Sequence, residues 1–128
     1  MKKENTEKLL KDFPKLYRQH SLPMTETCMC WGFDCGDGWF DVIYDLSKEI
    51  TKIDPNVEAV QVKEKFGGLR FYIGGVSNKT HDAVYEAVYK AEERAERTCE
   101  VCGKPGKITG TFWLKALCKE CNKKEVTK

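Results

Sequence analysis

The 128-residue sequence has no long hydrophobic run, no internal repeat and no low-complexity linker. A membrane-spanning helix needs about 20 consecutive apolar residues, and no stretch approaches that length. The opening residues MKKENTEKLLKDF also lack the apolar stretch of a secretory signal peptide. We therefore expect a cytoplasmic protein without a membrane partner. A chain of this length suffices for one domain and excludes a multidomain enzyme.

An excess of charge of one sign is also absent, because the net charge is only +2. The charges are nevertheless segregated. Residues 1–20 carry six basic and three acidic side chains, residues 99–128 carry seven and three, and the residues between them carry nine and fourteen. The isoelectric point of about 8.1 lies below the value above ~9 expected of a dedicated nucleic-acid-binding domain. Solvated basic ends are the better explanation of this pattern.

Apolar residues at helical spacing predict three helical regions. Residues 5–20 form a short helix capped by Asn5 or Thr6, and Pro14 interrupts it because proline cannot donate the helical hydrogen bond. A second helix follows Asp37, its expected N-cap, and runs from Trp39 to residue 53. A third covers about residues 80–98. Its buried stripe comprises Val84, Ala87, Val88, Ala91 and Ala95, and its solvated side comprises Glu92, Glu93, Arg94, Glu96 and Arg97.

Residues 57–73 are predicted to form a β-hairpin with Gly67 and Gly68 as its two-residue turn. This register places Phe66 opposite Leu69 and Glu64 opposite Phe71 on the apolar side. The other side is polar and comprises Gln61, Lys63, Lys65, Arg70 and Tyr72. Glu64 on the apolar side needs a hydrogen-bond or ion-pair partner if it is buried.

Four of the seven cysteines follow the pattern Cys99-x2-Cys102, fifteen residues, Cys118-x2-Cys121. Two residues between cysteines present both sulfurs to one tetrahedral ion, and fifteen residues allow a hairpin that brings the second pair round. We expect one structural Zn²⁺, with disulfides or free thiols as the alternatives. A closed four-thiolate shell leaves no open position for catalysis. Apolar cover for the site is expected from Phe112, Trp113 and Leu114.

The other cysteines, Cys28, Cys30 and Cys35, lack the paired spacing. Packing as small hydrophobic side chains beneath the neighbouring aromatic residues is the favoured interpretation. A second metal site with His20 or Asp34 as the fourth ligand is one alternative. Another is a thiolate nucleophile at Cys35, which precedes a predicted helix N-terminus.

The segments WGFDCGDGW (residues 31–39) and QVKEKFGGLRFY (residues 61–72), with a Glu-rich helix and CEVCG (residues 99–103), resemble a family of short uncharacterised proteins of bacteria and phages. The resemblance covers about residues 28–121. It implies a shared fold, a zinc ribbon and a bacterial or phage setting. It implies no reaction.

The polar face of the hairpin is the best sequence clue to a ligand. Cationic side chains suit a phosphate, tyrosine suits stacking on a ring, and glutamine suits a polar edge. Aromatic residues beside the glycines of residues 31–40 are typical of a pocket wall. The candidate ligand-binding residues are therefore Gln61, Lys63, Lys65, Arg70, Tyr72, Trp31 and Trp39. A solvated sheet face with protective lysines is the alternative.

Taken together, the sequence predicts an α+β fold in which helices pack on a small antiparallel sheet, with a C-terminal zinc ribbon. We expect an α+β core over residues 1–98, a ribbon over residues 99–121 within the same domain, and a basic tail over residues 122–128. The pattern favours a non-enzymatic binding protein for an anionic, nucleotide-like small molecule, such as a host signal. The first alternative is an adaptor or inhibitor whose ribbon contacts a host protein or nucleic acid. A weaker one is a metal-dependent nuclease using Gln61, Lys63 and the carboxylates Asp34, Asp37 or Asp41.

Overall fold

The computed structural model describes residues 1–126. The chain forms helix α1 (Lys3–Asp12), three short 3-10 turns, strand β1, helix α2 (Phe40–Ile53), the hairpin strands β2 and β3, helix α3 (His81–Glu96), the strands β4 and β5, and helix α4 (Lys119–Val126). The turns are η1 (Arg18–Ser21), η2 (Met29–Trp31) and η3 (Asp37–Trp39). The strands are β1 (Phe33–Asp34), β2 (Glu58–Lys65), β3 (Gly68–Gly74), β4 (Lys107–Thr109) and β5 (Lys115–Leu117).

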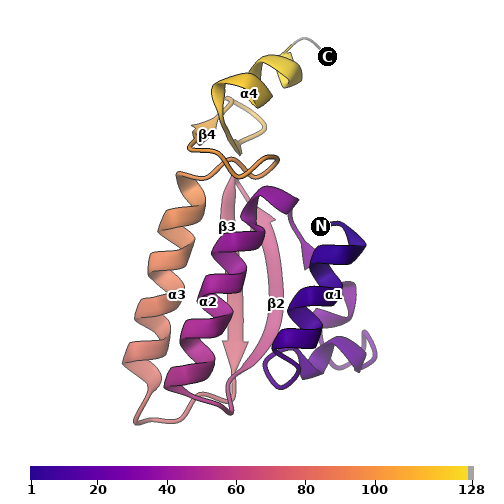
Figure 1. Ribbon diagram of the computed structural model, residues 1–128, viewed down its shortest axis with the longest axis vertical. Coiled ribbons are helices and arrows are strands. Elements are labelled where there is room, and N and C mark those ends of the chain that lie inside the picture. Colours follow the sequence, from indigo (N-terminus) through magenta and orange to yellow (C-terminus); the bar gives the residue numbers. More distant parts are fainter. Residues whose placement is uncertain (127–128) are drawn as a thin grey trace.

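The main sheet has the order β1-β2-β3, with β1 parallel to β2 and β2 antiparallel to β3. Helices α2 and α3 lie side by side along one face of the hairpin, and the small β4–β5 hairpin with α4 sits beyond the hairpin tip (Figure 1). The predicted α+β fold with a small sheet and a C-terminal ribbon is confirmed. The parallel strand β1, which makes the sheet mixed, was not predicted.

The apolar stripes of α2 and α3 enclose the core between the helices and the sheet. Ile43, Leu46 and Ile50 of α2 are almost fully buried, and the whole predicted stripe of α3 is buried as well. Trp39 is also completely buried, and its Nε1–H donates a hydrogen bond of 2.9 Å to the carbonyl oxygen of Thr98. A core of this kind stabilises the fold mainly by removing apolar surface from water.

The hairpin forms, but its register differs from the prediction. Lys65 pairs with Gly68 and Glu64 with Leu69, so the turn residues are Phe66 and Gly67. Both have positive φ angles, +54° and +82°, as the twist of a two-residue hairpin turn requires. The N–H of Gly67 donates a hydrogen bond of 2.7 Å to Glu64 Oε2, which gives that carboxylate its partner.

The changed register keeps each residue of the hairpin on its predicted face, with the exception of Phe66. Over residues 61–72 the pairing slides by two residues, and side chains alternate with a period of two, so this slip restores the same faces. A further irregularity between Ala59 and Gln61 shifts the register once more, so that Ile73 pairs with Ala59. Lys63 and Arg70 therefore remain on the polar face, although they now oppose each other directly. Phe66 lies in the turn and is exposed, so its predicted place opposite Leu69 was wrong.

Two predicted helix caps and one solvated residue are also corrected. Helix α1 begins at Lys3, so Asn5 and Thr6 lie inside it, and Asp37 does not cap α2. Asp37 Oδ1 instead accepts a hydrogen bond of 2.7 Å from the backbone N–H of Lys2 and one of 3.1 Å from Asn5 Nδ2. Glu92 is half-buried and accepts a hydrogen bond of 3.0 Å from the N–H of Phe71. Asp37 thus connects the start of α2 to the N-terminal segment, and Glu92 connects α3 to β3. Local sequence patterns do not predict such contacts between distant segments.

The predicted basic tail, residues 122–128, contains most of helix α4 up to residue 126. The rest of that segment lies outside the described residues. No helix within residues 1–126 combines the length and apolar character needed to cross a membrane.

Candidate metal centre

The four cysteines of the predicted ribbon converge at one point. The sulfur atoms of Cys99, Cys102, Cys118 and Cys121 all lie within 4.8 Å of one another, and the Cys102 and Cys118 sulfurs are 3.6 Å apart. Four sulfurs around one tetrahedral Zn²⁺, each at about 2.3 Å, would be separated by about 3.8 Å. The cluster therefore has the composition and dimensions to hold one metal ion.

The first pair of cysteines lies in a tight knuckle directly after α3. The N–H of Cys99 donates to the carbonyl of Lys104 at 2.8 Å, and the N–H of Gly103 donates to the carbonyl of Cys99 at 2.9 Å. Gly103 has a φ angle of +82°, which a residue without a β-carbon adopts readily. This closed loop turns both sulfurs of the pair to the same side.

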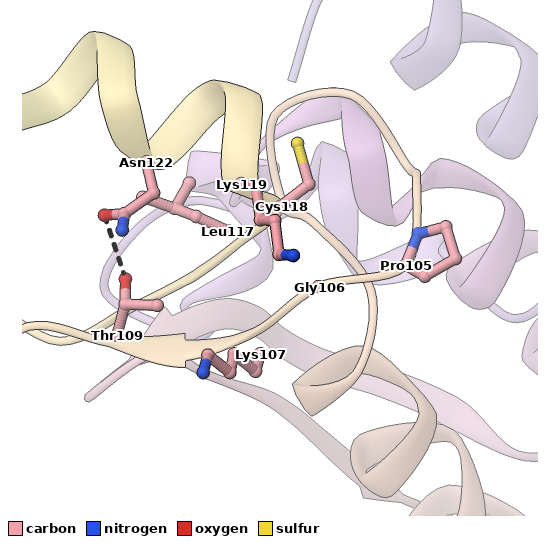
Figure 2. Close-up of a pocket in the computed structure, with 8 residues that line it drawn as sticks. All are labelled: Pro105, Gly106, Lys107, Thr109, Leu117, Cys118, Lys119 and Asn122. Carbon is pink, nitrogen blue, oxygen red and sulfur yellow. Dashed lines mark hydrogen bonds between the residues drawn. The ribbon is translucent and has the colours of Figure 1, made fainter.

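The second pair lies at the start of α4. The N–H of Cys121 approaches the Cys118 sulfur at 3.4 Å, and the N–H of Asn122 donates to the Cys118 carbonyl at 2.9 Å. A groove of about 330 Å³ runs beside this turn, between β4 and α4, and Thr109 and Asn122 face each other across it (Figure 2). The Cys118 sulfur points away from Thr109, so the groove and the metal cluster lie on different sides of Cys118.

The sulfur environment favours metal binding. Burial alone would raise the pKa of the Cys99 thiol, but backbone N–H groups directed at its sulfur, that of Cys118 foremost, lower this pKa to about 7. A hydrogen bond with the neighbouring Cys118 sulfur is the main cause that raises the pKa of Cys121 to about 12, because it holds the proton of the Cys121 thiol in place. A divalent cation among the four sulfurs would replace these thiol protons and stabilise the thiolate forms.

The knuckle docks on the glycine-rich loop between β1 and α2. Gly36 donates its N–H to Glu100 Oε2 at 2.8 Å, and Gly38 donates its N–H to the Glu100 carbonyl at 2.7 Å. A β-carbon on either glycine would collide with backbone oxygen atoms of residues 99–100. These glycines therefore permit close approach of two backbones, a role that the sequence analysis did not assign to them. The recurring glycines within the segment WGFDCGDGW were the available signal.

The expected apolar cover of the cluster was placed incorrectly. Phe112 and Trp113 project into solvent, and the small core at the cluster is formed by Leu117 together with Cys99 and Cys118. Ala116 of β5 is buried in the main core. The ribbon is thus packed onto the α+β core by its second strand, while the loop between β4 and β5 remains exposed.

The remaining cysteines do not assemble a second metal site. Within residues 1–126, no other group of three or more Cys, His, Asp or Glu side chains is placed to hold an ion. Cys28 is exposed and Cys30 is half-buried, whereas Cys35 is buried in the main core. Burial, followed by the charge of Glu100, raises the pKa of Cys35 to about 12. Its thiol is protonated at neutral pH, so the predicted alternative of a thiolate nucleophile is wrong.

The predicted ligand-binding residues separate into an open sheet face and two outlying residues. Lys63 opposes Arg70, and Gln61 opposes Tyr72 at the next pair on the same face of the sheet. Lys65 lies on the same face beside the hairpin turn.

Three carboxylates lie near this face. Asp34 is the neighbour of Lys63 on β1, and the charge of Glu92 lies near Arg70. Glu96 Oε1 and Arg70 Nη1 both lie within 4 Å of the position that a β-carbon on Gly68 would occupy.

A hollow of about 750 Å³ adjoins the sheet face. Gln61 and Tyr72 line it from the sheet, and residues 24–28 line it from the loop before η2. Lys63, Lys65 and Arg70 lie outside its lining. Trp31 is exposed on η2 but does not line the hollow, and Trp39 belongs to the core, so its predicted place at a ligand surface was wrong.

Comparison with protein-family models, curated proteins and solved structures gives no match.

Proposed function

We propose that this chain is a zinc-stabilised binding protein whose open sheet face takes an anionic, nucleotide-like small molecule. The metal part of the proposal rests on the four converging sulfurs. Thiolates suit soft and borderline cations, and four of them in a tetrahedral set are typical of structural Zn²⁺. Because all four positions are filled by protein ligands, the ion stabilises the ribbon and leaves no site for a reacting molecule.

The observation that carries the ligand part is the direct opposition of Lys63 and Arg70 across the hairpin. Like charges at opposed positions of a sheet repel, and in residues 1–126 neither side chain forms an ion pair. A phosphate between them would replace repulsion with two attractive contacts. Asp34, Glu92 and Glu96 lie near the pair and limit its net charge, which favours one phosphoryl group over an extended polyanion.

The next pair on the same face, Gln61 and Tyr72, supplies the contacts proposed for the base of the ligand. Tyr72 is exposed and offers a ring face for stacking, and Gln61 opposite it offers both a donor and an acceptor. Both residues line the 750 Å³ hollow, which is within the size range of small-molecule sites. A nucleotide could thus place its phosphate at Lys63 and Arg70 and its base at Tyr72.

Titration calorimetry with nucleoside mono- and diphosphates tests the proposal. Arg70→Ala is expected to abolish binding, and Arg70→Lys is expected to weaken it, because a point charge cannot make a two-pronged contact with phosphate. Tyr72→Phe should bind better than Tyr72→Ala if the ring stacks. Arg97→Ala, an equal loss of charge at the end of α3, is the control. Binding that survives Arg70→Ala would contradict the proposed site.

The nuclease alternative receives no support from the geometry. Asp37 is engaged by α1, Asp41 lies on the exposed side of α2, and only Asp34 adjoins Lys63. These carboxylates do not form a group that could hold a catalytic cation. A bacterial or phage setting, which the family resemblance implies, would suit a protein that sequesters a host signal.

A further inference from the structure

The hollow of about 750 Å³ beside the sheet face contains a carboxylate in its wall, that of Glu26. Glu26 is exposed, and within residues 1–126 its side chain forms no ion pair. The other described residues of the wall include no lysine, arginine, histidine or second carboxylate, since Lys63, Lys65 and Arg70 lie outside it. The hollow therefore favours a group that donates hydrogen bonds, whereas the adjoining sheet face favours an anion.

The loop that carries Glu26 is held against strand β2. Thr27 is buried, and its hydroxyl lies within hydrogen-bond distance of the Val60 carbonyl oxygen, at 3.4 Å. The N–H groups of Glu26 and Thr27 both donate to the Pro23 carbonyl oxygen, at 2.9 and 3.3 Å, and close a turn. Val60 directly precedes Gln61, so this turn brings Glu26 next to the strand residues proposed to bind the base.

An ionised carboxylate accepts hydrogen bonds and cannot donate them, which restricts the base that it can recognise. Guanine presents two adjacent donors on its Watson–Crick edge, N1–H and the exocyclic amine, and the two oxygens of one carboxylate can accept from both. Such a two-pronged, charge-assisted contact is stronger than a single neutral hydrogen bond. Adenine and cytosine each present one donor beside an acceptor nitrogen, and uracil presents one N–H between two carbonyls. These acceptors would face the second carboxylate oxygen without a proton between them.

We propose that the site selects guanine nucleotides, with Glu26 accepting hydrogen bonds from N1–H and the exocyclic amine of a base stacked on Tyr72. This inference rests on the proposed function, because it adds the choice of base to the same site. Gln61, the cross-strand partner of Tyr72, has an amide N–H group that suits the guanine O6 acceptor. The phosphate would lie at Lys63 and Arg70, outside the wall that carries the Glu26 charge.

Titration calorimetry with guanosine, inosine and adenosine monophosphates (GMP, IMP and AMP) tests the inference. The wild type is expected to bind GMP about 5- to 100-fold more tightly than AMP, the range for one bidentate contact to a base. IMP keeps N1–H but lacks the exocyclic amine, so its affinity should lie between the other two. Glu26→Gln should reduce the GMP affinity to that of AMP without weakening AMP. Glu49→Gln, the same change at an exposed carboxylate of α2, is the matched control and should keep the preference for GMP.

Cys28 provides a separate measurement of where the base binds. Its exposed thiol lines the same hollow, whereas the half-buried Cys30 does not line it. Saturating GMP should slow the reaction of Cys28 with N-ethylmaleimide severalfold, and peptide mass spectrometry follows that reaction with Cys30 as the internal reference. The same concentration of GMP should protect Cys28 less in Glu26→Gln.

The possible failures of the inference and of the proposed function give different results. Equal affinity of the wild type for GMP and AMP, with both lost in Arg70→Ala, would overturn the choice of base and leave the proposed function intact. No binding of any of the three nucleotides would contradict the proposed function, and the base preference with it. A preference for GMP that persists in Glu26→Gln, or bound GMP that leaves Cys28 fully reactive, would overturn the role of Glu26.

Discussion

The carbonyl oxygen of Glu100 accepts a hydrogen bond of 2.7 Å from the N–H of Gly38, and this contact fixes the first zinc knuckle to the α+β core. The Glu100 side chain reaches the neighbouring Gly36 as well. One residue of the knuckle thus bonds the loop that begins α2 through both its backbone and its carboxylate. The desolvated Glu100 carboxyl has a raised pKa despite its bond to Gly36. The ribbon and the core are therefore mechanically linked through residues 36–38 and 100.

Gly38→Ala is expected to destabilise the protein by about 1–3 kcal/mol, because the new β-carbon would collide with the Cys99 carbonyl oxygen and force the two backbones apart. Urea denaturation followed by circular dichroism measures this change. Gly74→Ala is the matched control, since its β-carbon would meet Val60 Cγ1 at 3.7 Å, an ordinary contact. Equal stability of the two variants would show that the loop and the knuckle do not approach as described.

Removal of the metal is expected to unfold the ribbon before the core. The cluster at the cysteines has almost no apolar support besides Leu117, so the metal–sulfur bonds supply most of the local stability. Chelation, or Cys118→Ser, should lower the protection of backbone amides against hydrogen exchange over residues 99–121 and at the end of α3, while the amides of α2 stay protected. Cys28→Ser, an exposed cysteine outside the cluster, is the control.

Elemental analysis of the purified protein provides the complementary measurement. We expect one zinc ion per chain in the wild type and in Cys28→Ser, and less than one in Cys118→Ser. A fully folded ribbon in a variant with all four cluster cysteines replaced by serine would contradict a structural role for the metal.

The cluster could be predicted from the sequence because the geometry of a knuckle is local. Two residues between Cys99 and Cys102 restrict their sulfurs to one side of a tight turn, and that restriction is independent of the rest of the fold. The faces of the hairpin were predictable for a similar reason, since alternation along a strand survives a slip of two residues. The turn itself was not, because Phe66 adopts a left-handed conformation that glycine normally favours.

The contacts between distant segments were beyond local patterns. The requirement for glycine at residue 38 arises from Cys99, which lies 61 residues further along the chain. The aromatic residues of both ends illustrate the same limit. Trp39 and Trp113 look alike in sequence, yet one is fully buried under the knuckle and the other is exposed beyond it. Only the docking of the ribbon distinguishes them.

Asp54 is expected to stabilise the fold in a pH-dependent manner. It is a buried carboxylate after α2 that accepts hydrogen bonds from Thr80 Oγ1 at 2.6 Å and from the N–H groups of Ser77 and Asn56, each at 3.0 Å. These bonds, that of Thr80 foremost, lower the pKa of Asp54 below its ordinary value of 3.8. The ionised carboxylate therefore adds to the free energy of unfolding above pH ~4, and this contribution is lost as the pH falls through the lowered pKa of Asp54.

The variant Asp54→Asn should be less stable than the wild type by about 1–3 kcal/mol at pH 7, with the difference shrinking between pH 5 and pH 3. Urea titrations at these pH values measure the difference. Asp45→Asn, the same change at an exposed carboxylate that pairs with Arg94, serves as the control and should show a much smaller effect. A gap that stays constant down to pH 3 would contradict the role assigned to the ionised carboxylate.

The opposition of Lys63 and Arg70 makes a prediction about the protein without any ligand. Because like charges directly across a sheet repel, Lys63→Gln should raise the free energy of unfolding by a few tenths of a kcal/mol at low salt. Lys65→Gln makes the same chemical change on the same strand and face, but Lys65 opposes Gly68, so no gain is expected there. Added NaCl should reduce the difference between the two variants, since salt screens the repulsion.

Inorganic phosphate should raise the melting temperature of the wild type and of Lys65→Gln more than that of Lys63→Gln. If Lys63→Gln instead loses stability, the flanking Asp34 already neutralises the lysine, and the face lacks the unsatisfied charge that an anionic ligand would meet.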